Sequence, residues 1–169
     1  MTEDGEKSRA APVDVELLRH ALRAEASEDD SDVDSAVEQM GDGAFDWIVG
    51  ELRSGALTSQ QQLRALGLLA LLCQEACVAR RGELLDRTME VAQSPTASLE
   101  ARSVAVLIAA LGAVVTKHFL GATEVYDGRT ADEVRAQVQD AARRALAVGV
   151  TPETEALIGE CLAATGPAR

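Results

Sequence analysis

The most apolar stretch of the chain runs from Ser103 to Val115, and after the serine it is apolar on every side of a helix. A helix of this kind belongs in a protein interior or in a bilayer. The unbroken apolar run, Val104 to Val115, has 12 residues, whereas a membrane span needs about 18 or more. Arg102 and Lys117 bracket it. We therefore predict a central core helix that ends near Lys117.

Apolar residues recur at helical spacing along most of the remaining chain. Gly41-Asp42-Gly43 is a turn signal, and segments beginning at Thr58 and Thr130 match the capping box that opens a helix. No segment alternates apolar and polar residues as a strand does, so we predict an all-α fold. The predicted helices cover about 12–26, a segment ending at 40, 44–54, 58–79, 83–93, 95–117, 130–148 and 151–165, with Gly82 breaking the helix 58–79.

The longest interruption between predicted helices is residues 118–129. A long irregular segment in a compact helical protein is usually functional, and aromatic and arginine side chains supply much of the energy of protein interfaces. His118, Phe119, Tyr126 and Arg129 are therefore our candidates for interaction with a partner. The alternative is that Phe119 packs back onto the core.

The charge of the chain is concentrated near its N-terminus. The net charge is −12, and residues 1–42 hold 13 acidic and 4 basic side chains. We predict an acidic, disordered tail over 1–11 and a single helical domain over 12–169. The chain lacks the basic stripe that nucleic-acid binding needs. A basic protein partner fits this charge, and solubility alone is the alternative explanation.

The cysteines and the polar N-terminus indicate a reducing compartment. Residues 1–11 lack the apolar core of a secretory signal, and Cys73, Cys77 and Cys161 lie in apolar segments. We predict a cytoplasmic protein, of bacterial origin because arginine far outnumbers lysine, with these thiols packed in the core. A zinc site on these cysteines is the weaker alternative, and the Asp-rich segment 29–34 does not match a calcium loop. We expect no metal and no cofactor.

A short amphipathic helix followed by a longer, more apolar one occurs twice, with an offset of 37 residues between the first helices and 38 between the second. The segments 62–69 (QLRALGLL) and 100–107 (EARSVAVL) share an arginine followed by small and apolar residues. Over residues 43–115 the chain resembles HEAT-type helical repeats, whose unit is about 40 residues. Gly67 comes earlier than the family pattern places its glycine, and Ser94-Pro95 stands where the family usually has Asp-Pro. The resemblance implies a scaffold whose concave face binds proteins.

Two architectures and two functions follow from these patterns. The fold is either a set of HEAT-like stacked helical hairpins or a compact irregular bundle of about seven to eight helices. The first function is a non-catalytic protein-protein interaction scaffold, one form of which is an immunity or inhibitor protein for a basic partner. The alternative is a small helical enzyme or lyase-like protein that uses His118 and a loop carboxylate such as Glu124 or Asp127.

Overall fold

The computed structural model describes residues 11–24, 31–119 and 128–164, with side chains at 11–24, 31–110, 128–130 and 132–160. Over these residues the chain forms eight α-helices and one 3₁₀ helix and has no strand, which confirms the all-α prediction. None of the described helices combines the length and apolarity needed to cross a membrane. The elements are α1 (Val15–Arg23), α2 (Ser31–Met40), α3 (Asp42–Ser54), α4 (Ser59–Leu72), η1 (Val78–Arg80), α5 (Arg81–Gln93), α6 (Leu99–Phe119), α7 (Ala131–Val148) and α8 (Pro152–Ala164).

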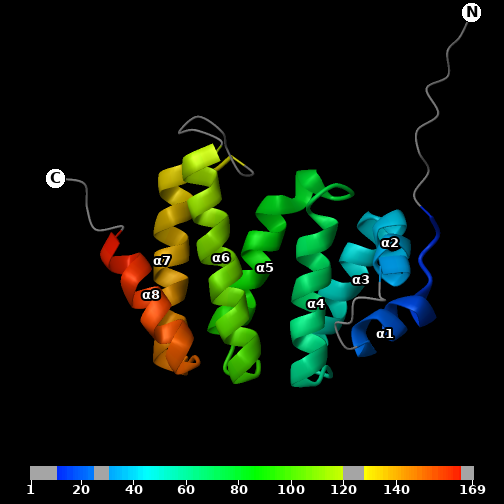
Figure 1. Cartoon of the computed structure of the whole chain (residues 1–169), viewed down its shortest axis with the longest axis horizontal. Coiled ribbons are helices and arrows are strands. Elements are labelled where there is room, and N and C mark those ends of the chain that lie inside the picture. The colour runs from blue at the N-terminus through cyan, green and yellow to red at the C-terminus, as the bar shows by residue number, and fades with distance from the viewer. Residues whose placement is uncertain (1–10, 25–30, 120–127, 165–169) are drawn as a thin grey trace, which may run out of the picture.

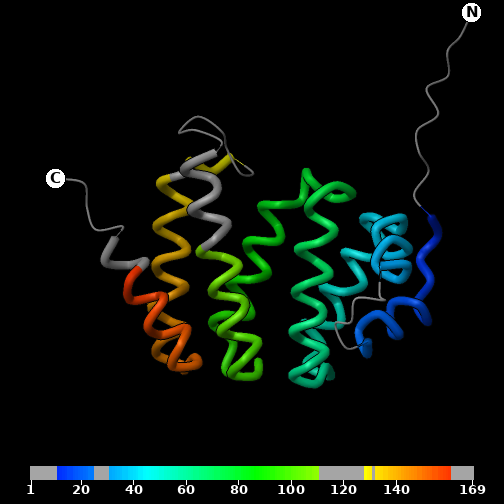
Figure 2. The backbone as a smooth tube through the Cα atoms, viewed as in Figure 1, coloured from blue at the N-terminus to red at the C-terminus, as the bar shows by residue number. Residues whose placement is uncertain are grey.

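The helices stand side by side along the long axis of the molecule, with α1 and α2 at one end and α8 at the other (Figure 1). In Figure 2 the colour changes steadily along this axis, so elements close in sequence are also close in space. Consecutive helices contact one another, among them α1 with α2, α3 with α4, α5 with α6, α6 with α7, and α7 with α8. Helices two apart also touch, since α4 contacts α6, α6 contacts α8, and α5 contacts α7. The chain is thus a row of packed hairpins in two layers.

The two middle hairpins are related by 39 to 40 residues. α3 and α5 begin at Asp42 and Arg81, 39 residues apart, while α4 and α6 begin at Ser59 and Leu99, 40 residues apart. The sequence pattern predicts offsets of 37 and 38, two residues shorter in each case. A helical face repeats every three to four residues, so apolar matching alone fixes such an offset only to within about one turn.

The two predicted capping boxes are confirmed. The Thr58 hydroxyl accepts a hydrogen bond from the Gln61 amide at 3.3 Å, and the Thr58 amide donates to the Gln61 side chain at 3.0 Å. At the start of α7, Thr130 and Glu133 satisfy each other in the same way. These reciprocal bonds satisfy amides that the first turn of a helix leaves without partners.

The prediction of one long helix from Thr58 to Ala79 is wrong at its end. α4 stops at Leu72, and the chain turns before η1 and α5. The Cys73 carbonyl, free at this helix end, accepts a hydrogen bond at 2.9 Å from Nε of Arg81. Arg81 therefore caps α4 from the first residue of the next helix. Gly82 does not break a helix, because it lies buried inside α5.

Two further boundaries differ from the prediction. Of the expected turn Gly41-Asp42-Gly43, only Gly41 lies outside a helix, with φ of 55°, and α3 already begins at Asp42. α6 continues to Phe119, so His118 lies in its last turn and does not open the interruption. The central position of α6 is confirmed, because it contacts α4, α5, α7 and α8 and none of residues 101–110 is exposed.

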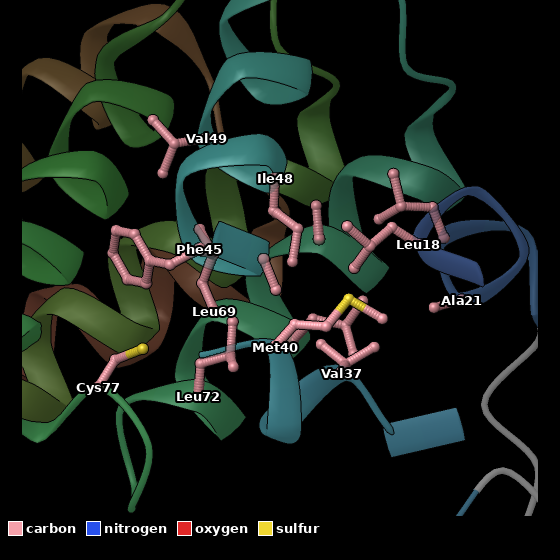
Figure 3. Close-up of a cluster of buried hydrophobic side chains, with 14 of the residues drawn as sticks. Leu18, Ala21, Val37, Met40, Phe45, Ile48, Val49, Leu69, Leu72 and Cys77 are labelled. Carbon is pink, nitrogen blue, oxygen red and sulfur yellow. The ribbon is translucent and has the colours of Figure 1, made fainter. Parts of the chain in front are cut away.

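The largest core cluster lies within α1–α4 and the turn that follows. Its centre is made of large side chains, among them Leu18, Phe45, Ile48 and Leu69, each with no exposed surface (Figure 3). The α5–α8 part is built around smaller residues. Two clusters there contain Ala92, Ala105, Ala109, Val106, Val134, Val138, Ala142, Ala145, Leu85, Ile158 and, from α4, Leu66.

Candidate functional site

Of the four predicted interaction residues, the structure describes the side chain of Arg129 only. Arg129 precedes α7, and its Nη1 donates to Asp86 Oδ1 and to Gln137 Oε1, both at 2.8 Å. Its side chain is only 18% exposed, so it serves inside the chain as a tie between α5 and α7. His118 and Phe119 lie in α6, but their side chains are outside the described residues, as are Tyr126 and the carboxylates Glu124 and Asp127. Their interface role stays a prediction.

The two neighbouring cysteines pack in the core, as predicted. Cys73 and Cys77 are free thiols, each 3% exposed, in the α1–α4 cluster. Burial is the largest cause that raises the pKa of each thiol from 9.0 to about 11, because a thiolate loses its hydration there. The side chain of Cys161 lies outside the described residues.

The Asp-rich segment 29–34, which runs into the first turn of α2, does not form a metal centre where the structure describes it. Asp34 is paired with Arg64 at 2.7 Å, and Asp32 is exposed, while Asp29 and Asp30 lie outside the described residues. Among the described side chains, no group of three or more His, Cys, Asp and Glu residues is placed to hold a metal ion.

α4 and α6 each carry uncharged surface that is at least partly exposed. On α4 it consists of Gln60, Leu63, Gly67 and Ala70, and on α6 of Leu107, and we call it the α4–α6 face. Gln60 and Gly67 are exposed, and the other three are partly exposed. Leu63, Ala70 and Leu107 belong to no core cluster, although their side chains are apolar. Both helices are covered by neighbours elsewhere, so these stripes form the free surface of the layer.

The middle of the α4–α6 face is a flat, open position. A Cβ atom built on Gly67 would have no heavy atom within 4 Å. α4 carries no charge after Arg64, and α6 carries none between Arg102 and Lys117. Uncharged surface with a glycine at its centre allows the backbone of another helix to approach closely. This is the chemistry of docking, with no group that could attack or protonate a substrate.

A groove of about 200 Å³ lies where the α3–α4 hairpin meets the α5–α6 hairpin. We call it the inter-hairpin groove. Its apolar lining comes from Val49, Leu52 and Val91, and its charged lining comes from Arg53, Arg87 and Glu90. The hydroxyls of Ser94 and Thr96, also in the lining, hydrogen bond to each other at 2.9 Å. No His or Cys is among the described lining residues, and the ionisable groups of the lining are Arg53, Arg87 and Glu90.

The α4–α6 face is the functional candidate that the sequence interpretation missed. Its signal was present as Gln60 and Gly67, which lie seven residues apart on α4. Steps of seven keep to one side of a helix. We interpreted Gly67 as a displaced family glycine, whereas the structure places it at the centre of the exposed stripe.

Comparisons with family models, with known proteins and with solved structures found no match to this chain.

Proposed function

We propose that this chain is a non-catalytic, HEAT-like helical scaffold that binds a basic protein partner on the α4–α6 face. The observation that supports this best is the row of uncharged, at least partly exposed positions on α4, together with Leu107 on α6. A soluble helix normally points polar or charged residues outward. A stripe of glycine, alanine and leucine on the outer side of a buried helix layer therefore favours a surface that is covered in the complex.

Charges at the two ends of the face indicate the chemistry of the partner. Glu75 is exposed just after α4, and Glu100 is exposed at the start of α6. Together with the net charge of −12, these carboxylates favour a partner helix with an apolar stripe and basic residues near its ends. Opposite charges at the rim steer the encounter and set the orientation, while the apolar stripe supplies the buried area.

Two glycines allow a matched test of the proposal. Gly67 lies at the centre of the face, and Gly50 lies on α3, in the other layer; both are exposed helix positions where an added Cβ atom would have no heavy atom within 4 Å. The variants Gly67→Arg and Gly50→Arg add the same side chain and the same charge. Because arginine favours helix more than glycine, by about 0.5–1 kcal/mol, both variants are expected to fold at least as stably as the wild type.

Affinity capture with the wild type and the two variants, each as the full-length chain, then tests whether the partner is retained. We expect wild type and Gly50→Arg to retain the same protein and Gly67→Arg to lose it, with retention falling steeply as salt rises because the rim charges are screened. Equal retention by Gly67→Arg would place the docking surface elsewhere. Retention that salt does not change would rule out the basic partner.

A further inference from the structure

The inter-hairpin groove holds an excess of positive charge. Nη1 of Arg87 donates to both carboxylate oxygens of Glu90 at 2.8 Å, and Nη2 of Arg53 approaches the same carboxylate at 3.5 Å. Neither arginine has a second carboxylate partner among the described residues. Two guanidinium groups therefore share one carboxylate, and the lining carries a net charge of +1 in a protein whose total charge is −12.

Most of the donors of these two arginines are unused. Nε of Arg87 is buried and has no hydrogen-bond acceptor. Within the described residues, Nη2 of Arg87 and the Nε and Nη1 atoms of Arg53 also make no hydrogen bond to the protein. The Nε and Nη2 edge of a guanidinium is a two-donor fork that matches the two oxygens of a carboxylate. Beyond their contacts with Glu90, the two arginines that line the groove thus keep N–H donors that no acceptor among the described residues fills.

The size and lining of the groove limit the ligand to a small apolar acid. A dry cavity of about 150 Å³ holds a benzene ring, so about 200 Å³ admits a phenyl or branched aliphatic group with its carboxylate. Val49, Leu52 and Val91 provide an apolar wall for that group. A single negative charge balances the +1 of the lining, whereas a dianion such as phosphate would leave an uncompensated charge beside Glu90.

We propose that the inter-hairpin groove is a binding site for a monocarboxylate with a small apolar body, held by Arg53 and Arg87. Two sources present this chemistry: a free aliphatic or aromatic acid, and the C-terminal residue of a peptide. The groove and the α4–α6 face share no residue. The proposed ligand site can therefore be tested independently of the proposed scaffold function.

The test is an NMR titration of the full-length, ¹⁵N-labelled chain that follows the arginine Nε–H signals. Phenylacetate is compared with phenylacetamide, and a pentapeptide ending in leucine is compared with its C-terminal amide. We expect saturable shifts of the Arg53 and Arg87 signals with the carboxylates, and binding at least about 10-fold weaker with the amides. Inorganic phosphate is expected to bind more weakly than phenylacetate. The tighter of the two carboxylate probes identifies the source.

Three variants separate binding from folding. Arg53→Gln removes an exposed donor and is expected to weaken phenylacetate binding by about 5- to 10-fold, whereas Arg135→Gln, on α7, leaves it unchanged. Glu90→Gln removes the competing carboxylate and is expected to tighten binding by about 3- to 10-fold, which a merely unfolded variant would not do. Equal binding of acids and amides, tighter binding of phosphate, or no response to Arg53→Gln and Glu90→Gln would each overturn the proposal.

Discussion

The N-terminal half of the molecule, α1–α4 with Cys73 and Cys77, and the C-terminal half, α5–α8, fill their interiors in different ways. Among the side chains that the structure describes, eight of the ten largest that are fully buried lie in α1–α4, and Thr88 and Val134 come from the other half. The buried residues of α5–α8 are mainly alanine and valine. Small side chains let helix axes approach closely, but each one removes less apolar surface from water.

In the C-terminal half, buried side-chain hydrogen bonds add to the contacts of the small apolar residues. Arg102 is 8% exposed, and its guanidinium donates to the carbonyls of Gly149, Ser94 and Ala97. The buried Ser103 hydroxyl accepts from the Thr151 amide at 2.9 Å and donates to the Leu99 carbonyl at 2.8 Å. These bonds join the start of α6 to the loop between α5 and α6 and to the loop between α7 and α8. An alanine-rich helix pair is thus held by hydrogen bonds at its ends as well as by contact along its length.

The two halves meet through few apolar contacts and several polar ones. Leu66 is the α4 residue that enters the core of the C-terminal half. Nη2 of Arg80 lies 2.6 Å from Asp46 Oδ1, and the Ser98 amide donates to the Gln62 side chain at 3.0 Å. The inter-hairpin groove opens at this same junction. Ligand sites commonly lie at such junctions because packing there is less complete.

The largest expected difference between the halves is in the cost of truncating a core side chain. Phe45→Ala empties the centre of the N-terminal core and is expected to lower the free energy of unfolding by about 3–5 kcal/mol. Phe45 also loses the contact with Arg80, whose guanidinium carbon lies 4.0 Å from the ring centroid. Val134→Ala removes two methyl groups from the other half and is expected to cost about 1–3 kcal/mol. Urea unfolding followed by circular dichroism measures both.

Equal costs for the two truncations would contradict the comparison. That result would mean that the α5–α8 core depends on its few large side chains as much as the N-terminal core does.

Replacing Arg102 tests the hydrogen bonds at the start of α6. Arg102→Met keeps the length of the side chain but leaves three carbonyls without their donor, and we expect it to cost about 2–4 kcal/mol. Arg64→Met is the matched change in the N-terminal half, where Arg64 bonds Asp34 at 2.7 Å and the Ala21 carbonyl at 3.1 Å. Because that site has an ion pair and is more exposed, we expect a cost of about 1–2 kcal/mol. Hydrogen exchange at Thr151 distinguishes the two, since only Arg102→Met should speed it. Unchanged exchange would mean that Arg102 does not hold the loop.

The sequence predicted the helices well because their signals are local. Apolar spacing and the capping residues Thr58 and Thr130 act within one or two turns, so they can be recognised without knowing the neighbours. The end of α4 was wrong for the opposite reason. Its capping donor, Arg81, comes from the next helix, and the turn between them brings it back to the helix end.

The candidate sites depended on packing that the sequence does not display. Arg129 looks like an interface residue in a loop, but the structure pairs it with Asp86, 43 residues away. The inter-hairpin groove gathers Arg53 and Arg87 from different hairpins, and nothing in the local pattern of either residue indicates the other. Only Gly67 carried a local signal, through its seven-residue spacing from Gln60 on α4.

Both described thiols, Cys73 and Cys77, lie in the N-terminal half. We therefore expect the effect of their ionisation on stability to arise in that half. Folding raises the pKa of Cys73 and Cys77 from 9.0 to about 11, so between these values the unfolded chain binds fewer protons. Stability is therefore full below pH 9 and falls as the pH rises toward 11. At pH 10 we expect the two thiols together to contribute a loss of about 2 kcal/mol. Urea unfolding at pH 8, 9 and 10 measures it, and the double variant Cys73→Ala/Cys77→Ala should lack this part of the slope. An identical slope in the double variant would assign the loss to other groups.

The smallest effects show whether the two halves unfold together. Thr58→Ala removes the cap of α4 and Thr130→Ala removes that of α7, and each is expected to cost about 1 kcal/mol.

Trp47, the single tryptophan, packs against the N-terminal core, so its fluorescence follows that half, whereas circular dichroism follows both. Because Leu66 joins the cores and α4 contacts α6, we expect one cooperative transition. Thr130→Ala should then shift the fluorescence midpoint as much as Thr58→Ala does. A fluorescence midpoint that only Thr58→Ala shifts would show that the junction is too weak to couple the halves, and the groove would then open between two independently folding units.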